Sequence, residues 1–475
     1  MPEERREQQS FYLNQDDQSI YNDTVNGDKI RGVQGTLLLS RWLRISLRTR
    51  KDTSCVFNNL LHHINVETLK EAYNAMDKNK ALGVDKISKE AYGKNLEANL
   101  ENLYIKIRNG SYKPQIKREV LIPKANGKTR PIEIACFEDK LVDYVVSKIL
   151  SAVYEPSFIR NSFGFRPNKS AHNAIEACYY SLKDNKRPFV VEIDFSNFFN
   201  TIPHKKLMSI VKKKIADYRF NGLVRRFLKS STLKSDGTIH KNDCGTPQGG
   251  VMSPILANIY LNEVVDQWFL KNYGSYNNII VRYVPERSDK CPWGADDATF
   301  FFKKESDAKD FMLQFKARIE AFGLSLNMDK TRTLNFNKSK ENSFDFLGFT
   351  FYWGKQNKKR TLKVKTQKDK LHKSMNEFYE WIKKDRNSMK LKEIWSIAKS
   401  KLQGHYNYFG FWMNRQKLVH FYSEAIKALF KWLNRRSQKK SYNWDSFHRR
   451  LEFNPLPIPP EVTKLMKLGK TYGQI

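Results

Sequence analysis

Two adjacent carboxylates, Asp296 and Asp297, are followed directly by the run Ala-Thr-Phe-Phe-Phe. Adjacent carboxylates repel each other, so a fold that holds them together commonly does so to bind a cation. The apolar residues after them predict a buried strand, which places the pair at the tip of a strand hairpin. Taken alone, the pair also fits an ordinary solvated surface turn, so its meaning depends on other acids in the chain.

A third acid, Asp194, lies near the end of the apolar run Phe189–Phe195, which predicts a buried strand. An unpaired charge at such a position is costly unless it has a partner. A capping role would explain it more simply. Three carboxylates delivered from strand ends, however, fit a two-metal site for phosphoryl transfer, in which one ion activates a hydroxyl and the other steadies the leaving oxygens.

Between these acids stands a glycine-rich string, Gly245-Thr-Pro-Gln-Gly-Gly-Val-Met-Ser-Pro254. Pro254 is expected at a helix start, where the missing N–H of proline has no cost. The paired glycines allow backbone to approach a ligand closely. An isolated glycine-rich loop is a weak signal, but its place between Asp194 and the acid pair makes it a strong one.

The net charge of the chain restricts the class of partner that it can bind. The 475 residues include 84 Lys and Arg against 50 Asp and Glu, a net charge of +34. Such an excess calls for an anionic partner, either nucleic acid or an acidic membrane surface. The longest apolar stretch, Gly35–Leu47, carries two arginines and is too short to span a bilayer, and no signal-peptide pattern opens the sequence. Five scattered cysteines without a Cys-x-x-Cys pair favour a reducing compartment over a disulfide or zinc framework.

Hydrophobic periodicity and turn signals predict a mixture of helices and strands. Helices are expected over 66–76, 91–109, 138–154, 254–270 and 311–322, and strands over 189–195, 278–283, 298–302, 333–337 and 345–352. Asn126-Gly127 predicts a hairpin turn after a strand at 119–122. After about residue 355 the pattern becomes helical and basic.

Several further segments carry a resemblance to a known family. They are Lys80–Asp85, Ile122–Pro131, Ser162-Phe-Gly-Phe-Arg-Pro167 with Ser170-Ala-His172, Gly323–Thr331 and Phe346–Phe349. In family order from about residue 65 to 460, they and the acids resemble the group II intron-encoded reverse transcriptases, or maturases. The resemblance implies an α+β right-hand polymerase, fingers and palm, followed by an α-helical thumb or maturase domain. We expect a weakly structured arm over 1–60, fingers and palm over 61–355, an RNA-binding thumb over 356–460 and a tail over 461–475.

The resemblance also implies roles for single residues. Asp194, Asp296 and Asp297 would be the catalytic acids and would bind two Mg²⁺ ions. The nucleotide-binding residues would be Lys124 and Arg130 at the triphosphate, Phe199 under the sugar as a screen against a 2′-hydroxyl, Gln248 in the nucleotide pocket, and Lys330 beside it. Leu347 and Gly348 would form part of the primer grip.

The C-terminal stretch combines cations with aromatic rings. Residues 351–450 contain 26 Lys and Arg but 7 Asp and Glu. The segments 402–410 and 430–437 resemble the maturase domain that holds intron RNA. The cations expected to contact RNA are Lys431, Arg435, Arg436, Lys439 and Lys440. Rings at Tyr406, Tyr408, Trp412, Tyr422 and Trp432 could stack on bases, although aromatics at helical spacing more often belong to a core.

The sequence departs from the family at the acid hairpin. In the family the acids follow an Arg-Tyr pair directly, whereas here Val284–Gly294 separates Arg282-Tyr283 from Ala295. Either this segment is an insertion in the hairpin, or Trp293-Gly294 takes the place of Arg-Tyr.

Three functions therefore stay open. The first is a Mg²⁺-dependent RNA-directed DNA polymerase that also assists intron splicing and mobility. The others are a catalytically impaired RNA-binding maturase, and a host-adopted reverse transcriptase in defence or repair. The expected partners are intron RNA, an RNA template, a DNA primer or target and deoxynucleoside triphosphates, without a membrane and with a homodimer left open. The expected compartment is the bacterial cytoplasm or an organelle matrix.

Overall fold

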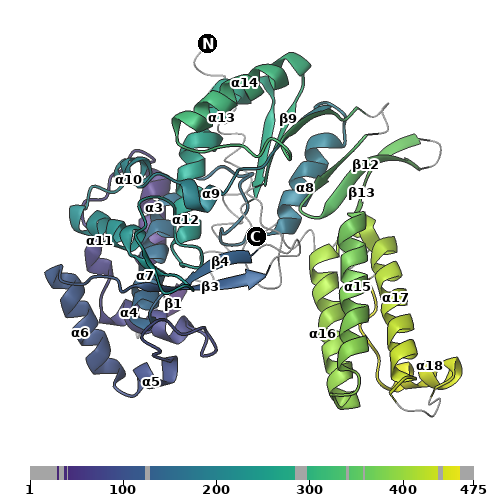
Figure 1. Cartoon of the computed structure of the whole chain (residues 1–475). Helices are drawn as coiled ribbons and strands as arrows, with labels where there is room; N and C mark the ends of the chain where they lie inside the picture. Colours follow the sequence, from purple (N-terminus) through teal and green to yellow (C-terminus); the bar gives the residue numbers. More distant parts are fainter. Residues whose placement is uncertain are drawn as a thin grey trace. The chain divides into compact units, whose positions relative to one another are not determined.

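The computed structural model describes residues 29–31, 37–39, 41–123, 129–283, 297–337, 342–356, 359–436 and 442–460, with backbone alone at 29–31, 37–39, Pro123, Arg130, Asp297 and Gln356. The chain divides into two compact units (Figure 1), residues 1–169 with 190–333, and residues 170–189 with 334–475. Among the described residues, no helix is both long and apolar enough to cross a bilayer.

The first unit begins with helices that surround one buried helix. Its helices up to residue 154 are α3 (Arg41–Lys51), α4 (Val66–Ala75), α5 (Lys89–Gly93), α6 (Leu96–Asn109) and α7 (Phe137–Tyr154), after the short pair β1 (Lys29–Arg31) and β2 (Leu37–Leu39). Along α7, Val142, Val146 and Ile149 are fully buried. The predicted helix over 91–109 is two helices, α5 and α6, broken at Lys94–Asn95.

A four-stranded sheet of order β4-β3-β6-β7 lies in this unit. Its strands are β3 (Lys117–Pro123), β4 (Thr129–Ile134), β6 (Thr232–Leu233) and β7 (Ile239–His240). The predicted hairpin is confirmed, because β3 and β4 pair antiparallel out to Pro123 opposite Thr129. Asn126-Gly127 lies outside the described residues.

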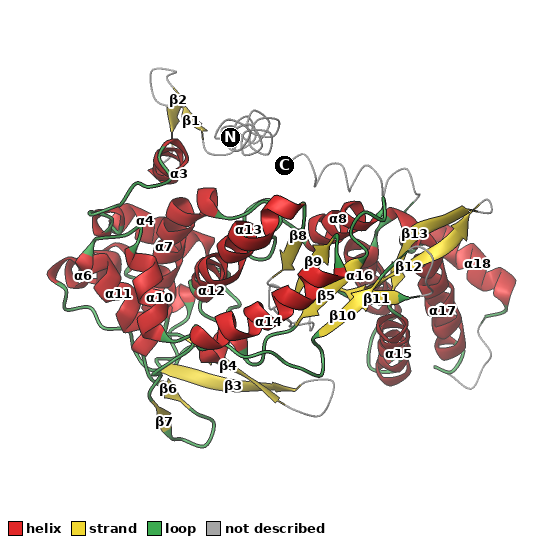
Figure 2. Cartoon of the chain, turned by 90° about the horizontal axis from the view of Figure 1, so that it is seen from above, coloured by secondary structure: helices red, strands yellow, loops and turns green. Residues whose placement is uncertain are grey.

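The second sheet has the order β10-β5-β9-β8. Its strands are β5 (Phe189–Ile193), β8 (Ile279–Tyr283), β9 (Asp297–Phe302) and β10 (Arg332–Asn335), and β5 and β10 straddle the division between the units. Helices α9 (Phe198–Thr201), α10 (His204–Lys212), α11 (Tyr218–Lys229), α12 (Ser253–Leu261), α13 (Gln267–Tyr273) and α14 (Glu305–Ala321) complete the first unit. Figure 2 shows α14 lying along this sheet. Rings from α13, α14 and β9 form the core there, with Phe300 and Phe311 centroids 4.5 Å apart.

The long helix predicted over 254–270 contains an irregularity. It begins at Ser253, with Pro254 in the first turn as expected, but residues Asn262–Asp266 form a π-helical turn between α12 and α13. Such turns occur frequently at functional sites. The hydrophobic pattern did not reveal it, because a single π-turn shifts the apolar face by only one residue.

The second unit consists of a β-meander and a helical bundle (Figure 1). Its elements are α8 (Ala171–Leu182), β11 (Ser343–Phe346), β12 (Phe349–Gln356), β13 (Lys359–Thr366), α15 (Lys368–Asp385), α16 (Leu391–Phe409), α17 (Arg415–Leu433) and α18 (Trp444–Phe453). The rings of Phe378 on α15 and Phe421 on α17 pack edge to face, with centroids 6.2 Å apart. On α8, Nε2 of His172 bonds the carbonyl oxygen of Tyr408 at 2.9 Å.

The single strand predicted over 345–352 is wrong. The structure has two antiparallel strands, β11 and β12, joined by a tight turn at Leu347-Gly348. Both turn residues have positive φ, 48° and 76°. A two-residue hairpin loop requires this backbone shape, which glycine adopts freely and leucine adopts only under strain.

Candidate active site

Asp194 follows β5 directly and is 8% exposed. Its Oδ2 accepts a hydrogen bond from Nδ2 of Asn327 at 3.1 Å and lies 3.4 Å from Nζ of Lys330. The carbonyl oxygen of Asp194 accepts a second bond from the N–H of Asn327. Within the described residues, no donor meets the other carboxylate oxygen, Oδ1. This oxygen can therefore serve as a ligand to a divalent cation.

The register of the acid hairpin follows from β8 and β9. They pair antiparallel with Tyr283 opposite Asp297 and Arg282 opposite Ala298. Arg282-Tyr283 thus ends β8, and residues 284–296 connect the two strands. This pairing favours an insertion in the hairpin over the substitute pair Trp293-Gly294. Asp296 and the side chain of Asp297 lie outside the described residues.

Ring contacts along α14 order the neighbouring strands β5 and β9. Phe311 contacts Phe302 and Phe300, with centroids 5.1 and 4.5 Å apart. Phe315, one turn further along, contacts Phe300 at 5.7 Å and Phe195 at 6.3 Å. The helix therefore runs from the end of β9 back towards its start and then to Phe195, the second residue beyond β5. The end of β5 lies on the side of the sheet where β9 begins.

Arg282 is held by a buried polar network. Its Nε and Nη2 donate to the two carboxylate oxygens of Asp266 at 2.9 and 2.7 Å, and these two residues are 1% and 0% exposed. Nη1 donates to Oδ1 of Asn258, and Nη2 also donates to Oγ of Ser162. Bidentate geometry and these added partners compensate the cost of burying two charges. The network joins β8 to the π-turn and to the Ser162–Pro167 string.

The glycine-rich loop is clamped by backbone on two sides. Gly245 has φ +83°, and a Cβ there would meet the carbonyl oxygen of Phe199 at 2.8 Å. Gly249 has φ +115°, and a Cβ there would meet the carbonyl oxygen of Glu133 on β4 at 2.7 Å. The N–H of Glu133 donates to the carbonyl oxygen of Gln248 at 2.6 Å. Glycine is required at both positions for conformation and for space.

Gln248 and Phe199 lie at this loop. Nε2 of Gln248 donates to Oδ1 of Asn200 at 2.7 Å. Phe199 is 3% exposed and meets Phe198 edge to face.

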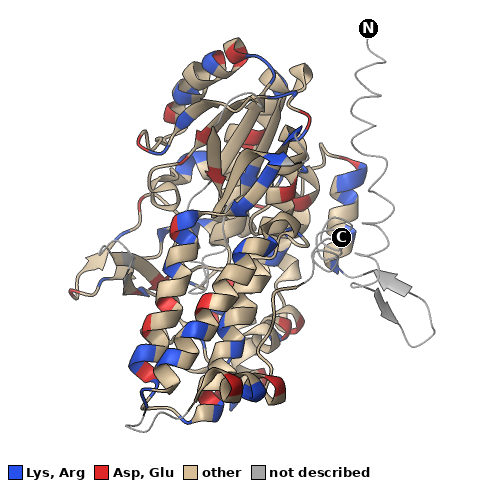
Figure 3. Cartoon of the chain, turned by 90° about the vertical axis from the view of Figure 1, so that its right-hand side faces the viewer, with Lys and Arg blue, Asp and Glu red and all other residues tan. Residues whose placement is uncertain are grey.

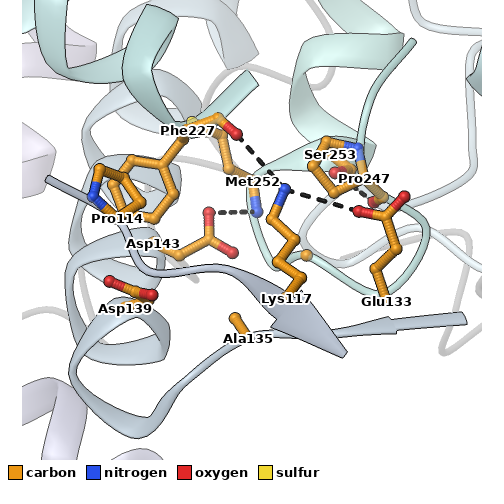
Figure 4. Close-up of a pocket in the computed structure, with 11 residues that line it drawn as sticks. Pro114, Lys117, Glu133, Ala135, Asp139, Asp143, Phe227, Pro247, Met252 and Ser253 are labelled. Atoms are coloured by element: carbon orange, nitrogen blue, oxygen red, sulfur yellow. Dashed lines mark hydrogen bonds and ion pairs between the residues drawn. The ribbon is translucent and has the colours of Figure 1, made fainter. Parts of the chain in front are cut away.

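A small cavity of about 20 Å³ lies behind the loop (Figure 4), with room for a water molecule but not for a nucleotide. Asp143 on α7 accepts the N–H groups of Val251 and Met252 at 2.6 and 3.1 Å, and so anchors the loop at the start of α12. Nζ of Lys117 lies 3.5 Å from Oε2 of Glu133. Burial raises the pKa of Asp143 to about 6, against the effect of its two backbone donors, and lowers the pKa of Lys117.

The other predicted nucleotide and primer residues lie in separate elements. Lys124 and the side chain of Arg130 lie outside the described residues, although Arg130 belongs to β4 and pairs with Ile122. Leu347 is 6% exposed, and its carbonyl oxygen accepts a bond from the hydroxyl of Tyr408 at 3.2 Å. Leu347 and Gly348 belong to the second unit.

Two of the five predicted RNA contacts of the second unit, Lys431 and Arg435, lie around one ring, together with Arg386, which was not predicted. The cationic groups of Lys431, Arg435 and Arg386 lie 5.5, 5.1 and 4.8 Å from the ring centroid of Trp432. Nζ of Lys431 also donates to the hydroxyl of Tyr379 at 2.7 Å. Lys431 and Arg435 are exposed. We call Lys431, Arg435 and Arg386 the tryptophan cation cluster.

Two further predicted cations and one ring set complete this surface. Arg436 is half-buried and donates to the carbonyl oxygen of Met389 at 2.9 Å, while Lys439 and Lys440 lie outside the described residues. Among the rings that could stack on bases, Tyr406 and Trp432 are buried and Tyr408, Trp412 and Tyr422 are half-buried. The rings therefore serve mainly as core, and the cations remain the candidates for RNA contact.

Sequence reasoning missed the partners of the predicted residues. Asn327, Asn200, Asp143 and Asp266 each act through a contact distant in sequence. The bond between Asn327 and Asp194, for example, joins residues 133 positions apart. Asn327 stands within the Gly323–Thr331 segment, which was the one available signal.

A sheet with an acid at a strand end, an acid hairpin beside it and a glycine loop clamped against both strand and helix defines the palm and fingers of a nucleic-acid polymerase. Residues 122–351 match the family described as reverse transcriptase (RNA-dependent DNA polymerase). The chain belongs to the group II intron-encoded reverse transcriptase and maturase family, with a right-hand polymerase fold followed by a helical domain.

Individual relatives differ in how much they share. Protein YkfC of Escherichia coli strain K12 is 32% identical, over 56% of this chain and 74% of its own length. The group II intron-encoded protein LtrA of Lactococcus lactis subsp. cremoris is 35% identical over 46% of this chain, but the match spans only 37% of LtrA. Telomerase from Candida albicans, solved with a fragment of telomeric RNA, covers 77% of this chain and 66% of its own at 15% identity and a TM-score of 0.40, a likeness too distant to carry an argument.

Proposed function

We propose that the protein is an RNA-directed DNA polymerase that adds deoxynucleotides to a DNA primer on an RNA template. Asp194, Asp296 and Asp297 would hold two Mg²⁺ ions. The observation that carries the proposal is Asp194 itself, a nearly buried carboxylate with Oδ1 left without a donor among the described residues, at the end of the strand beside β9. When bound, the two ions would activate the primer hydroxyl and neutralise charge on the triphosphate.

The chain's own side chains would then orient the nucleotide. Lys330, with a side chain 60% exposed, stands near Asp194 with its amine towards the same carboxylate oxygen as Asn327. This amine would hold Asp194 in one rotamer and leave Oδ1 to the metal. Lys124 and Arg130 would contact the triphosphate from the β3–β4 hairpin, and Gln248 would line the pocket.

Phe199 is proposed as the sugar gate. Its ring is buried against Phe198, and its carbonyl oxygen lies against Gly245. Because both the backbone and the ring of Phe199 are packed in this way, the ring cannot move aside. A 2′-hydroxyl on the sugar would therefore clash with it. This arrangement supports a preference for deoxynucleotides over ribonucleotides.

The second unit would bind intron RNA through the tryptophan cation cluster. Three cations around one ring repel each other, and Figure 3 marks further Lys and Arg along the helices of this unit. A phosphate backbone would relieve that repulsion and release counterions. The protein would assist splicing and mobility in this way and work wherever its RNA is, in a bacterial cytoplasm or an organelle matrix.

The first test is primer extension on an RNA template with Mg²⁺. Replacing Asp194→Asn should lower the extension rate by at least about 10³-fold, because the amide cannot supply an anionic ligand. RNA affinity should stay within about twofold of the wild type. Asp236→Asn, on the exposed turn between β6 and β7, is the matched control and should extend normally.

Two outcomes would change the assignment. Normal extension by the Asp194→Asn variant would remove the carboxylate from catalysis. Failure of the wild type to extend any template, with RNA binding intact, would leave an RNA-binding maturase as the function.

A further inference from the structure

The backbone of Gln248 makes contacts of its own, separate from those of its side chain. Its carbonyl oxygen accepts the N–H of Glu133 at 2.6 Å, and Gly249 beside it packs so closely on β4 that an added Cβ would lie 2.7 Å from the carbonyl oxygen of Glu133. On the opposite side, Asn200 donates its N–H to the carbonyl oxygen of Asn197 at 2.9 Å. Only the side-chain torsions of Gln248 and Asn200 remain free.

One hydrogen bond removes that freedom. Nε2 of Gln248 donates to Oδ1 of Asn200 at 2.7 Å, and Asn200 immediately follows the buried Phe199 on α9. An amide bonded through its nitrogen presents its carbonyl oxygen, Oε1, in a defined direction. An unbonded glutamine on an exposed loop would sample several rotamers and both amide orientations.

We propose that Asn200 is a positioning residue that holds the Gln248 amide so that Oε1 faces a hydrogen-bond donor on the incoming nucleotide. This inference rests on the polymerase function proposed above. Asn200 acts through Gln248 and couples its orientation to Phe199, its chain neighbour. The free energy of this arrangement should appear in nucleotide affinity, because the bond orders a side chain before the substrate arrives.

The test is a double-mutant cycle on primer extension. Asn200→Ala should raise the KM for a deoxynucleoside triphosphate about 3- to 10-fold and leave kcat within twofold, since a lost neutral hydrogen bond is worth about 1 kcal/mol. Asn200→Asp should stay near the wild type, because its carboxylate accepts the same N–H. In a Gln248→Ala background, Asn200→Ala should add nothing.

A matched control comes from the second unit. Nε2 of Gln403 donates to Oδ1 of Asn407 at 2.8 Å on the exposed surface of α16, the same pair of side chains in the same orientation. Asn407→Ala should leave the KM for the nucleotide unchanged. The melting temperatures of the single variants at Asn200 and Asn407 should match the wild type, because both residues are exposed.

Three results would overturn the inference: an unchanged KM in Asn200→Ala, additive effects in the double variant, or Asn200→Asp behaving like Asn200→Ala. The same cycle is also measured as the dissociation constant of the nucleotide from a complex with a dideoxy-terminated primer. Coupling in that binding assay without any extension by the wild type would contradict the polymerase function and support the Asn200 assignment. Extension without coupling would support the polymerase function and contradict the Asn200 assignment.

Discussion

At the scale of single residues, the glycine loop shows two requirements that can be separated. Gly249 has a positive φ, and the carbonyl oxygen of Glu133 also leaves no room for a Cβ at this position. Gly237, in the turn between β6 and β7, also has a positive φ, +84° against +115° at Gly249, but a methyl group added there would have nothing within 4 Å. A substitution at Gly237 therefore reports conformational strain alone, and one at Gly249 reports strain and a clash.

Gly249→Ala should destabilise the protein by about 2–4 kcal/mol, against about 1 kcal/mol for Gly237→Ala. The backbone of Gln248 should also move, so the KM for the nucleotide should rise in the first variant only. Thermal unfolding and steady-state extension measure the two effects. Equal losses of stability in both variants would mean that the loop yields to the methyl group without cost.

At the scale of elements, the π-turn Asn262–Asp266 carries two acids in contrasting settings. Asp266 is fully buried against Arg282, whereas Glu263 pairs with Lys213 at 2.5 Å with side chains 33% and 58% exposed. The first pair joins the turn to β8 and through it to the acid hairpin. The second is partly exposed to water, where an ion pair contributes less.

Asp266→Asn should cost about 3–5 kcal/mol of stability, because it leaves the buried guanidinium without its counter-charge. Glu263→Gln should cost less than about 1 kcal/mol. Chemical denaturation of the full chain measures both. If the variant at Asp266 is as stable as the one at Glu263, the network does not hold β8.

Element prediction succeeded where the signal was local. The β3–β4 hairpin, β5, β8 and β9 were all anticipated, because alternating or continuous apolar runs end at clear turn residues. The turn at Leu347-Gly348 was missed because leucine is a poor signal for positive φ. From the sequence the candidate site could be predicted only as a list of acids, and that list stays a prediction. Asn327, Asn200 and Asp143 could not be predicted, since each meets its partner only after strands and helices pack.

At the scale of the whole molecule, the net charge is +34, and the cations that produce it differ in whether they have a carboxylate partner. Some cations of α17 are already neutralised within the protein, as Lys427 is by Glu424 at 2.8 Å. Others, such as Lys431 on α17 and Arg435 just beyond it, face rings rather than carboxylates. Within the described residues these cations have no carboxylate partner, which is why we propose them as the contacts to an external polyanion.

RNA binding should accordingly weaken steeply with salt. Lys431→Ala and Arg435→Ala should each reduce the slope of log K against log salt by about 1, whereas Lys427→Ala should leave it nearly unchanged. Fluorescence anisotropy with labelled intron RNA at several salt concentrations measures the slopes. Equal slopes for all three variants would exclude the tryptophan cation cluster as the binding surface.

The pairing of Tyr283 with Asp297 has a consequence for how this hairpin can vary. A one-residue slip between β8 and β9 would turn every side chain of a strand to the opposite face. The ladder and the buried Arg282 network prevent such a slip, so residues 284–294, which precede the acid pair, can lengthen or shorten without rotating the strands. The entropy cost of closing a loop grows only with the logarithm of its length, so added residues change the stability little. The sequence and length of this segment can therefore vary, or a peptide can be grafted into it, while the side chains of β9 stay on the same faces of the sheet.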